Sequence, residues 1–584
     1  MTAPNRNALW ARTFADELAR TGIDAVCIAP GSRSTPLTEA FDRHDDIETF
    51  SHLDERSAAY FALGRARRTG EVTPIVCTSG TAAANFHPAV IEASQARVPM
   101  LVLTADRPPE LRDSGANQTV DQEKLYGGAV RWYKDMPEPE ATDRKLRSLR
   151  TTAARAVSEA TGVDAGPVHL NFPFRKPLEP TYVEGDVPAD LDPEALDGRS
   201  GSRPYVKTTA GAPELSDDHL RKLADDLAVD RGLVVAGPAD PPGFNAEAVA
   251  AFAHATGFPV VADPLSGLRF GGHTRTTTVL GGYDAYLDER VTADWADPEV
   301  VVRIGASPTS KALRKYLART DARQYLVDPT GRWREAEFGA TDLVEAEPSV
   351  LAWRLSQLIR NRPDESWNAL WTDAEDAYWD LVDDETDTFE GRVAADVADL
   401  APEPSTLFVS NSMPVRDLDR FARPSTKSRT VLGNRGASGI DGIVSSALGA
   451  GSAATDHLTL LTGDLAYYHD MNGLLALGRL GVDATIVLVN NDGGGIFHML
   501  PIEEYEPPFT DQFKTPHGLD FAATEDLYDL SFASVDPDDF RDAYAESVAT
   551  DGTDVIEVRT DAESSHRVRE RIAERAIERL SESD

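Results

Sequence analysis

The chain has 584 residues, enough for about three or four domains of ordinary size, and its hydrophobic fraction of 41% excludes a wholly disordered protein. Asp and Glu number 97 against 58 Lys and Arg, so the formal net charge is −39. This charge argues against a protein that binds nucleic acid or an anionic membrane surface. No apolar run approaches the roughly 18–20 residues that a membrane-spanning helix needs, so we expect no membrane insertion.

Residues 1–22 lack the apolar core of a signal peptide and have the pattern of an amphipathic helix. Cys27 and Cys77 lie in apolar runs typical of buried strands, so we expect reduced thiols and no disulfide. These features predict a cytoplasmic protein. Acidic residues are spread along the whole chain, which favours adaptation to a salt-rich cytoplasm, where screening shortens the reach of charge repulsion. An acidic enzyme without a salt requirement is the alternative.

Residues 1–180 contain three short apolar runs, DAVCIAP, TPIVCTSG and PMLVLTAD, which alternate with amphipathic stretches beginning near Pro36, Asp54 and Thr81. This alternation predicts a parallel sheet with helices on both faces. Residues 181–212 are rich in Pro, Gly and acidic residues without periodicity, and we predict that they form a linker.

A second block of the same kind spans residues 213–360, with expected strands at GLVVAGP, FPVVADP, EVVVRIG and QYLVDP. Residues 361–400 are acidic and predict a helical linker. Residues 401–584 form a third block, with expected strands at STLFVSNS, TVLGNR, LTLLTGD, ATIVLVNND and DVIEVRT, and a C-terminal helix. The predicted fold class is α/β, with three doubly wound parallel-sheet domains. A layout of this kind does not by itself determine a function.

A cation site is predicted within residues 463–495, GDLAYYHDMNGLLALGRLGVDATIVLVNNDGGG. One expected strand ends at Gly463-Asp464 and another at Asn490-Asn491, so both polar ends meet at one edge of a parallel sheet. A carboxylate, an amide oxygen and a backbone carbonyl suit Mg²⁺, which keeps few protein ligands and also binds diphosphate oxygens and water. Mn²⁺ is an alternative ion. For the segment itself, the alternative is two ordinary strand-to-loop turns.

This segment resembles the thiamine-diphosphate signature, which runs from Gly-Asp-Gly to Asn-Asn, although Leu465 stands at the third position. A broader resemblance, to the MenD family, extends over nearly the whole chain. It is carried, in chain order, by APGSRSTPL (29–37), HLDERSAAYFALG (52–64), TSGTAAAN (78–85), TADRPPELRDSGANQTVDQ (103–121), SNSMPVRDLD (410–419), GNRGASGIDG (433–442) and NNDGGGIFHMLP (490–501). The first and third blocks would then be the pyrimidine-binding and diphosphate-binding domains of a thiamine-diphosphate enzyme.

The resemblance also implies roles for individual residues. The metal ligands would be Asp464, Asn491 and the carbonyl of Gly493, and the residues acting in catalysis would be Glu55, Gln118 and Arg435. Glu55, Arg435 and the metal ligands would also touch the cofactor, and Gln118 the substrates. Further cofactor contacts are implied for Thr78, Ser79, Gly80, Ser412, Ile440, Gly463, Leu465 and Ile496. Further substrate contacts are implied for Ser32, Arg33, Arg107, Asn117, Lys311, Arg416 and Phe497.

Glu55 would be the carboxylate that shares a proton with N1′ of the cofactor's pyrimidine. Its alternative role is to complement the dipole of the helix that it begins. Arg33, Arg107, Arg416 and Arg435 each follow an expected strand and are predicted to lie in loops. Arginine is suited to two-pronged recognition of carboxylates, whereas the alternative for any one of the four is a surface salt bridge.

One position departs from the family pattern. The family often has Lys followed by Arg in the middle block, but here Lys311 is followed by Ala312. Arg314 lies two residues further along the expected helix and therefore on a different face. Only Lys311 is carried over as a substrate-binding residue.

The resemblance implies a transferase of menaquinone synthesis that decarboxylates 2-oxoglutarate on thiamine diphosphate and adds the succinyl-semialdehyde carbanion to isochorismate. It also implies a homodimer, or a dimer of dimers, in which the first block of one subunit and the third block of another share each site. The nearest alternative is another thiamine-diphosphate 2-oxoacid decarboxylase or carboligase, such as an acetohydroxyacid synthase. Intact Glu55, Asp464 and Asn491 argue against a non-catalytic protein that kept the fold.

Overall fold

A computed structural model describes residues 3–360 and 365–582. It contains three six-stranded sheets, and every strand pairing recorded in these residues is parallel. The α/β class with three parallel sheets is therefore confirmed. The chain divides into two compact units: Met1–Gly211, Asn434–Ala454 and Asp470–Val482 form the first, and Ala212–Gly433, Thr455–His469 and Asp483–Asp584 form the second.

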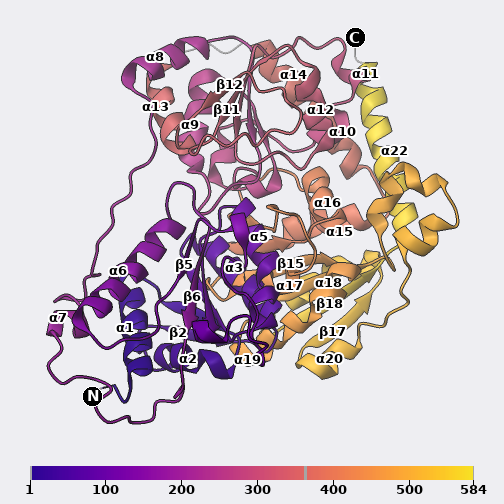
Figure 1. Cartoon of the computed structure of the whole chain (residues 1–584). Helices are drawn as coiled ribbons and strands as arrows, with labels where there is room; N and C mark the ends of the chain where they lie inside the picture. The colour runs from indigo at the N-terminus through magenta and orange to yellow at the C-terminus, as the bar shows by residue number, and fades with distance from the viewer. Residues whose placement is uncertain (1–2, 361–364, 583–584) are drawn as a thin grey trace. The chain divides into compact units, whose positions relative to one another are not determined.

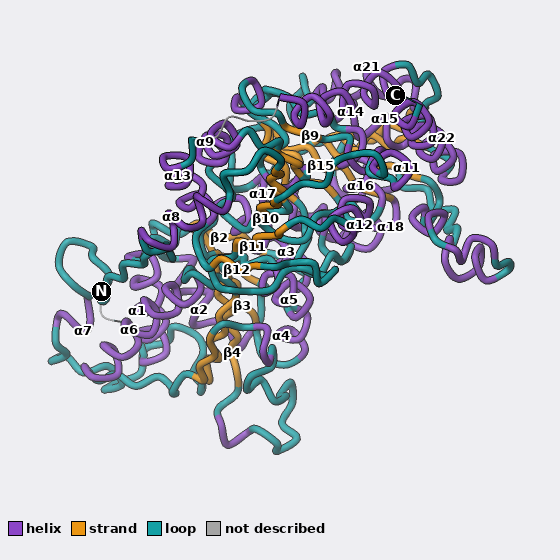
Figure 2. The backbone as a smooth tube through the Cα atoms, turned by 90° about the horizontal axis from the view of Figure 1, so that it is seen from above, coloured by secondary structure: helices purple, strands orange, loops and turns teal. Residues whose placement is uncertain are grey.

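The first unit contains the first sheet, in the order β2-β1-β3-β4-β6-β5. Its strands are β1 (Ala25–Ile28), β2 (Glu48–Ser51), β3 (Thr73–Cys77), β4 (Met100–Asp106), β5 (Trp132–Asp135) and β6 (Pro167–Pro173). One side of the sheet carries α1 (Arg6–Arg20), α2 (Thr35–Asp42) and α6 (Asp143–Ala160), and the other carries α3 (Glu55–Thr69), α4 (Thr81–Asn85) and α5 (His87–Gln95) (Figures 1 and 2). Helices on both faces explain why β3, β4 and β6 are buried along their whole length.

The second sheet has the order β12-β11-β10-β7-β8-β9 and lies in the second unit. Its strands are β7 (Gly232–Ala236), β8 (Val260–Ala262), β9 (Val279–Leu280), β10 (Val300–Ile304), β11 (Arg323–Val327) and β12 (Asp342–Val344). The sequence predicted four of them, and it missed β9 and β12 because edge strands of two and three residues carry too little pattern. The main helices around this sheet are α8 (Asp217–Asp226), α9 (Ala246–Thr256), α12 (Lys311–Arg319) and α13 (Pro348–Leu358).

The predicted helical segment 361–400 contains α14 (Glu365–Asp383) and α15 (Glu390–Leu400), while residues 361–364 lie outside the described residues. The third sheet follows in the order β14-β13-β15-β16-β18-β17. Its strands are β13 (Ser405–Val409), β14 (Arg429–Leu432), β15 (His457–Gly463), β16 (Thr485–Asn490), β17 (Ser531–Val535) and β18 (Asp554–Arg559). Its helices include α16 (Met413–Phe421), α18 (Asp464–Asp470), α21 (Phe540–Ser547) and the C-terminal α22 (Ala562–Ser581).

One helix from the third block packs within the first unit. Helix α17 (Ile443–Gly451) crosses α3, and the contact is made by backbone. A Cβ atom at Gly64 would lie 1.8 Å from the carbonyl oxygen of Ser446, and one at Gly449 would lie 2.0 Å from that of Phe61. Only glycine permits helices to approach this closely. The segment Asn434–Ala454 belongs to the first unit for this reason, which a contiguous third block at 401–584 does not anticipate.

Three smaller expectations can be compared with the structure. Cys27 and Cys77 are buried and free, as predicted. The predicted linker contains one short helix, α7 (Pro193–Asp197), which its composition did not indicate. The prediction that Arg416 lies in a loop was wrong, because a helix begins at Met413, directly after the turn that follows β13, and includes it. Among the described residues, no helix is long and apolar enough to cross a membrane.

Candidate active site

In the first unit, the predicted site residues follow neighbouring strands of the first sheet. Ser32 and Arg33 lie in a turn after β1, Thr78–Gly80 come after β3, and Arg107 comes directly after β4. The carboxyl ends of parallel strands meet at one edge, where folds of this kind bind ligands. The backbone N–H of Arg33 donates to Oγ1 of Thr78 at 3.2 Å, so the first two of these loops are in contact.

Two arginines at this edge form no ion pair with any residue that the structure describes. Arg33 is buried, and its Nη1 donates to the carbonyl oxygen of Phe174 at 2.7 Å. Burial lowers the pKa of Arg33, the nearby charge of Arg107 lowers it further, and the charge of Asp106 only partly opposes these effects. Nε of Arg107 is buried without an acceptor, and neither guanidinium forms an ion pair with any residue that the structure describes. Two adjacent unpaired cations are suited to an anionic ligand, because a bound carboxylate would offset their mutual repulsion.

The segment after β4 carries Asn117 and Gln118 on an exposed loop that extends from the sheet (Figure 2). Gln118 has a left-handed backbone, with φ of 55°, and is linked twice to the loop after β3. Oγ of Ser79 donates to the carbonyl oxygen of Gln118 at 3.0 Å, and Nε2 of Gln118 donates to that of Ser79 at 3.1 Å. A Cβ atom at Gly80 would lie 3.0 Å from Cγ of Gln118, so Gly80 leaves room for this side chain.

Glu55 is the first residue of α3, as expected from its sequence. Asp54 caps the helix by accepting the N–H groups of Arg56 and Ser57. Glu55 is half-buried at the start of α3, a helix that packs against β3. Burial and then the charge of Glu55 raise the pKa of the Cys77 thiol, the last residue of β3. The charge of the Glu55 carboxylate therefore acts on the strand that leads into the loop beginning at Thr78. Its proposed contact with a pyrimidine stays a prediction.

The loop that carries Arg435 and Ile440 is held by a buried glutamate that sequence reasoning missed. Glu92, in α5, accepts the N–H groups of Gly436 at 2.7 Å, Ala437 at 2.5 Å and Ser438 at 3.3 Å, and also pairs with Arg67. Three consecutive N–H groups around one carboxylate fix the backbone next to Arg435. The only signal in the sequence was an acidic residue inside the otherwise apolar helix HPAVIEASQ.

In the second unit, Asp464 lies at the end of β15 and begins α18. Its carboxylate accepts the N–H of Leu465 at 2.6 Å and that of Gly493 at 2.9 Å, and contacts Nε2 of His517 at 3.2 Å. Burial raises the pKa of Asp464, and these donors only partly oppose that effect. A cation at this carboxylate would favour the ionised form further.

The Asn491 side chain is oriented by a second carboxylate. Its Nδ2 donates to Oε1 of Glu390 at 2.7 Å, and Glu390 is in turn paired with the buried Arg569. With the amino group bound in this way, Oδ1 of Asn491 is buried and has no donor within the described residues. A buried acceptor without a hydrogen-bond donor is unusual, and a metal ion coordinated by this oxygen would satisfy it.

The glycines after Asn491 form a close backbone turn. Gly493 has φ of 137°, and a Cβ atom there would lie 2.0 Å from the carbonyl oxygen of Lys514. Gly494 donates its N–H to the same oxygen at 2.7 Å. Ile496 and Phe497 follow in a short 3-10 helix, where Phe497 packs edge-on against Phe513.

The remaining predicted residues of this unit lie at two helix starts. Ser412 precedes α16 with a left-handed φ of 71°, and Nη1 of Arg416 donates back to its carbonyl oxygen at 2.6 Å. Lys311 is the first residue of α12, which is capped by Ser310. The Lys311 side chain is exposed and forms no ion pair with the residues that the structure describes.

These residues fit a diphosphate-bound magnesium ion. Asp464 supplies a carboxylate, Asn491 an unsatisfied amide oxygen, and the Gly493 turn leaves no room for a side chain. Within residues 3–360 and 365–582, no cluster of three or more His, Cys, Asp or Glu side chains could hold a metal. One carboxylate and neutral oxygens are sufficient for Mg²⁺, which takes further ligands from phosphate and water.

Three family models match the chain. Residues 10–125 match the thiamine pyrophosphate enzyme N-terminal TPP binding domain, residues 199–409 the middle domain, and residues 415–558 the C-terminal TPP binding domain. The 2-succinyl-5-enolpyruvyl-6-hydroxy-3-cyclohexene-1-carboxylate synthase of Halorubrum lacusprofundi is 64% identical, with all of both chains covered. The chain belongs to this synthase family. The resemblance to the MenD family is thereby confirmed.

Other relatives agree with this membership. The synthase of the same name from Haloquadratum walsbyi is 63% identical over 99% of this chain and 100% of its own. The one from a Roseiflexus strain is 47% identical, with 96% of each chain covered. A solved structure, the thiamine diphosphate-dependent 4-hydroxybenzoylformate decarboxylase of Rhodococcus jostii, superposes with a TM-score of 0.70 over 94% of this chain and 99% of its own. At 18% identity, that likeness shows the fold alone.

Proposed function

We propose that this chain is a transferase that decarboxylates 2-oxoglutarate and joins the remaining four-carbon unit to isochorismate, as a step of menaquinone biosynthesis. The observation that carries the proposal is the 64% identity, over the full length of both chains, to a synthase named for the product of that reaction. The matched TPP-binding domains support thiamine diphosphate as the cofactor. When bound, it supplies the electron sink that lets a 2-oxoacid lose carbon dioxide.

Residues of both TPP-binding domains would hold the cofactor and its metal ion. Asp464, Asn491 and the Gly493 carbonyl would hold Mg²⁺ or Mn²⁺, and Gly463, Leu465 and Ile496 would line the cofactor. The half-buried Glu55 would share a proton with the pyrimidine, and Thr78–Gly80 would lie beside it. These assignments are supported by the unsatisfied Oδ1 of Asn491 and by the position of Glu55 at the start of α3, which packs against β3.

Substrate recognition would fall to cations without carboxylate partners. Each proposed substrate carries two carboxylates, and Arg33, Arg107 and Lys311 form no ion pairs with described residues. Arg416 and Arg435 would add two further guanidiniums, and Ser32, Asn117, Gln118 and Ser412 would add hydrogen bonds. Phe497 would contribute an apolar wall. Arginine's planar fork is suited to this chemistry.

We also propose that the active enzyme is a cytoplasmic homodimer, or a dimer of dimers, in which Glu55 of one subunit and Asp464 of another serve one site. The matched N-terminal and C-terminal TPP-binding models support two cofactor-binding domains in each chain. The net charge of −39 supports a protein that works in concentrated salt and does not bind nucleic acid.

The test is a product assay with 2-oxoglutarate and isochorismate, with and without thiamine diphosphate, in Mg²⁺ and in Mn²⁺. We expect the conjugated product only when both substrates, the cofactor and a divalent ion are present. Pyruvate in place of 2-oxoglutarate is the control for an acetohydroxyacid synthase. Product from pyruvate, and none from 2-oxoglutarate with isochorismate, would contradict the proposal.

A further inference from the structure

The backbone immediately before Lys311 is held by two buried aspartates. The N–H of Thr309 donates to Oδ2 of Asp263 at 2.8 Å, and Oγ of Ser310 donates to Oδ1 of Asp284. Ser310 also caps α12 by accepting the N–H of Leu313 at 3.0 Å. The position of the Lys311 backbone is therefore set by side chains outside its own helix.

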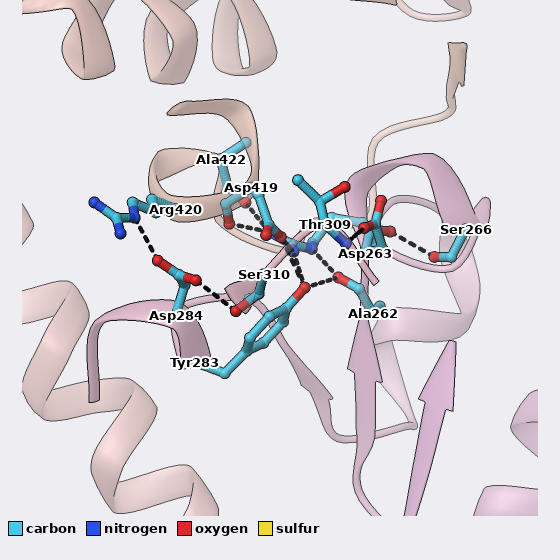
Figure 3. Close-up of polar contacts among 12 residues, drawn as sticks. Ala262, Asp263, Ser266, Tyr283, Asp284, Thr309, Ser310, Asp419, Arg420 and Ala422 are labelled. Atoms are coloured by element: carbon cyan, nitrogen blue, oxygen red, sulfur yellow. Dashed lines mark hydrogen bonds and ion pairs between the residues drawn. The ribbon is translucent and has the colours of Figure 1, made fainter. Parts of the chain in front are cut away.

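Asp284 connects this helix start to α16. Its other oxygen, Oδ2, accepts a hydrogen bond from Nε of Arg420, so that one carboxylate lies between Arg420 and Ser310 (Figure 3). Arg420 is one helical turn beyond Arg416 and lies on the same face of α16. A single side chain thus joins the two elements that carry Lys311 and Arg416.

A second contact anchors the same end of α16. Oδ1 of Asp419 accepts from Nη2 of Arg269 at 2.9 Å and from the hydroxyl of Tyr283 at 2.7 Å. Nη1 of Arg269 donates to the carbonyl oxygens of Asp419 and Ala422, both at 3.0 Å. Tyr283 directly precedes Asp284 in the chain, so both contacts reach α16 from one short helix, α10 (Tyr283–Tyr286) (Figure 3).

The charge state of Asp284 suits a structural link. Burial opposes its ionisation, but Arg420, Ser310 and the backbone N–H of Ala312 outweigh that effect and lower the pKa of Asp284. The Asp284 carboxylate is therefore ionised and bound to Ser310 and Arg420. Lys311, by contrast, is exposed and forms no ion pair with any described residue, so its ammonium group is available to a ligand.

We propose that Asp284 is a positioning residue for the second substrate, which fixes Lys311 relative to Arg416 through Ser310 and Arg420. The inference rests on the proposed function, because it takes Lys311 as a group that binds a carboxylate of isochorismate. A fixed distance between two cations favours a dicarboxylate over a monocarboxylate, since both contacts form without further ordering of the protein.

The experiment compares Asp284→Asn with wild type in the full-length holoenzyme. We expect KM for isochorismate to rise about tenfold, because hydrogen bonds to a charged group contribute free energy of that order. KM for 2-oxoglutarate and the affinity for thiamine diphosphate should change by less than about twofold. Calorimetric titration of isochorismate, without 2-oxoglutarate, should show the same tenfold loss.

Asp288→Asn is the matched control. Asp288 lies four residues away, caps α11 (Glu289–Thr292) and pairs with the exposed Arg290. Its substitution should leave both KM values unchanged. If Asp284→Asn does not fold, Ser310→Ala separates α12 from Asp284 while leaving Arg420 bound, and it should raise KM for isochorismate selectively as well.

The outcomes separate the two ideas. Wild type that forms no product from 2-oxoglutarate and isochorismate contradicts the proposed function and, with it, this inference. Active wild type combined with an equal rise of both KM values, or with parallel loss of thiamine diphosphate, shows a general structural role and overturns the inference alone. Unchanged constants in Asp284→Asn, or in Ser310→Ala where Asp284→Asn does not fold, also overturn it.

Discussion

The first and third sheets have the same strand order but carry different chemistry at corresponding positions. The first runs β2-β1-β3-β4-β6-β5 and the third β14-β13-β15-β16-β18-β17, so β1 corresponds to β13 and β3 to β15. After β3 the chain places the polar loop Thr78–Gly80, whereas after β15 it places the carboxylate of Asp464. After β4 comes Arg107, whereas Asn491 follows β16.

The same scaffold thus carries a cationic edge in one sheet and an oxygen-rich edge in the other. The edge of the first sheet carries Arg33 and Arg107, which form no ion pair with the described residues, and no metal-binding cluster of acidic, His or Cys side chains occurs in the part of the chain that the structure describes. That of the third sheet offers Asp464 and the unsatisfied Oδ1 of Asn491. The comparison teaches that strand order determines where ligands bind, while a few loop residues determine which ligand binds.

The largest effect is expected from Asp464→Ala, which removes the proposed charged metal ligand at the edge of the third sheet. Thiamine-diphosphate affinity at fixed Mg²⁺ should fall by about a hundredfold or more, because changing residues that only support metal ligands already costs about 10–100-fold, and Asp464 would be a direct ligand. Calorimetry would measure it, with the exposed Asp483→Ala as control. Unchanged binding in Asp464→Ala would mean that the metal assignment is wrong.

Glu55→Gln tests the opposite edge. Cofactor binding should survive, because the amide nearly preserves volume, but hydrogen–deuterium exchange at C2 of the bound thiamine should slow by about 10²–10⁴-fold, as expected for loss of acid–base assistance. Proton NMR would follow the exchange. Glu48→Gln, an exposed residue of β2, is the control. A wild-type exchange rate in Glu55→Gln would contradict the catalytic role of Glu55 and leave it only its role at the start of α3.

Arg416→Ala and Arg435→Ala test the proposed substrate contacts of the third block. Each should lower kcat/KM by about 2–5 kcal/mol in transition-state free energy, since truncating one partner of a buried charge pair has a cost of this size. Arg423→Ala is the control, because Arg423 pairs with the exposed Asp383 and lies over the ring of Trp379, away from the proposed substrate contacts. Steady-state kinetics in which either residue behaves like this control would remove it from the site.

Mixing the inactive Glu55→Gln and Asp464→Ala variants tests whether residues from two subunits form one active site. Glu55→Gln and Asp464→Ala, unfolded and refolded together, should regain activity approaching about a quarter of wild type, because half of random dimers are mixed and half of their sites are intact. Refolding each variant alone provides the control. If each site is built within one chain, no activity will return.

The smallest effect is expected from salt, which acts on the acidic charge distributed along the whole chain. Raising KCl from about 0.1 M to about 1 M shortens the Debye length from about 10 to about 3 Å, which should raise the Tm of a chain with net charge −39. Scanning calorimetry would follow the shift, and a matched series in sucrose separates ionic from excluded-solute effects. Equal Tm at all KCl concentrations would disprove the salt adaptation.

The sequence predicted most of the fold because buried parallel strands appear as continuous apolar runs. β3, β15 and β16 were predicted in this way, and with them the positions of Asp464 and Asn491. Arg416 was misplaced because its helix starts right after the strand, leaving almost no loop. Glu92, Glu390 and Asp284 were missed because their partners lie far away in sequence, and periodicity reports only local neighbours.

The path of the chain between the two units affects how the protein is cleaved by proteases and how it unfolds. The backbone passes from one compact unit to the other after Gly211, Gly433, Ala454, His469 and Val482. Neither unit is a continuous stretch of polypeptide, so no single proteolytic cut releases an intact half. Two connections of the third sheet pass through helices that belong to the other unit: α17 joins β14 to β15, and α19 (Ala476–Leu480) lies between β15 and β16. Unfolding of the first unit would therefore release segments that connect strands of the second, so the chain path itself couples the unfolding of the two units.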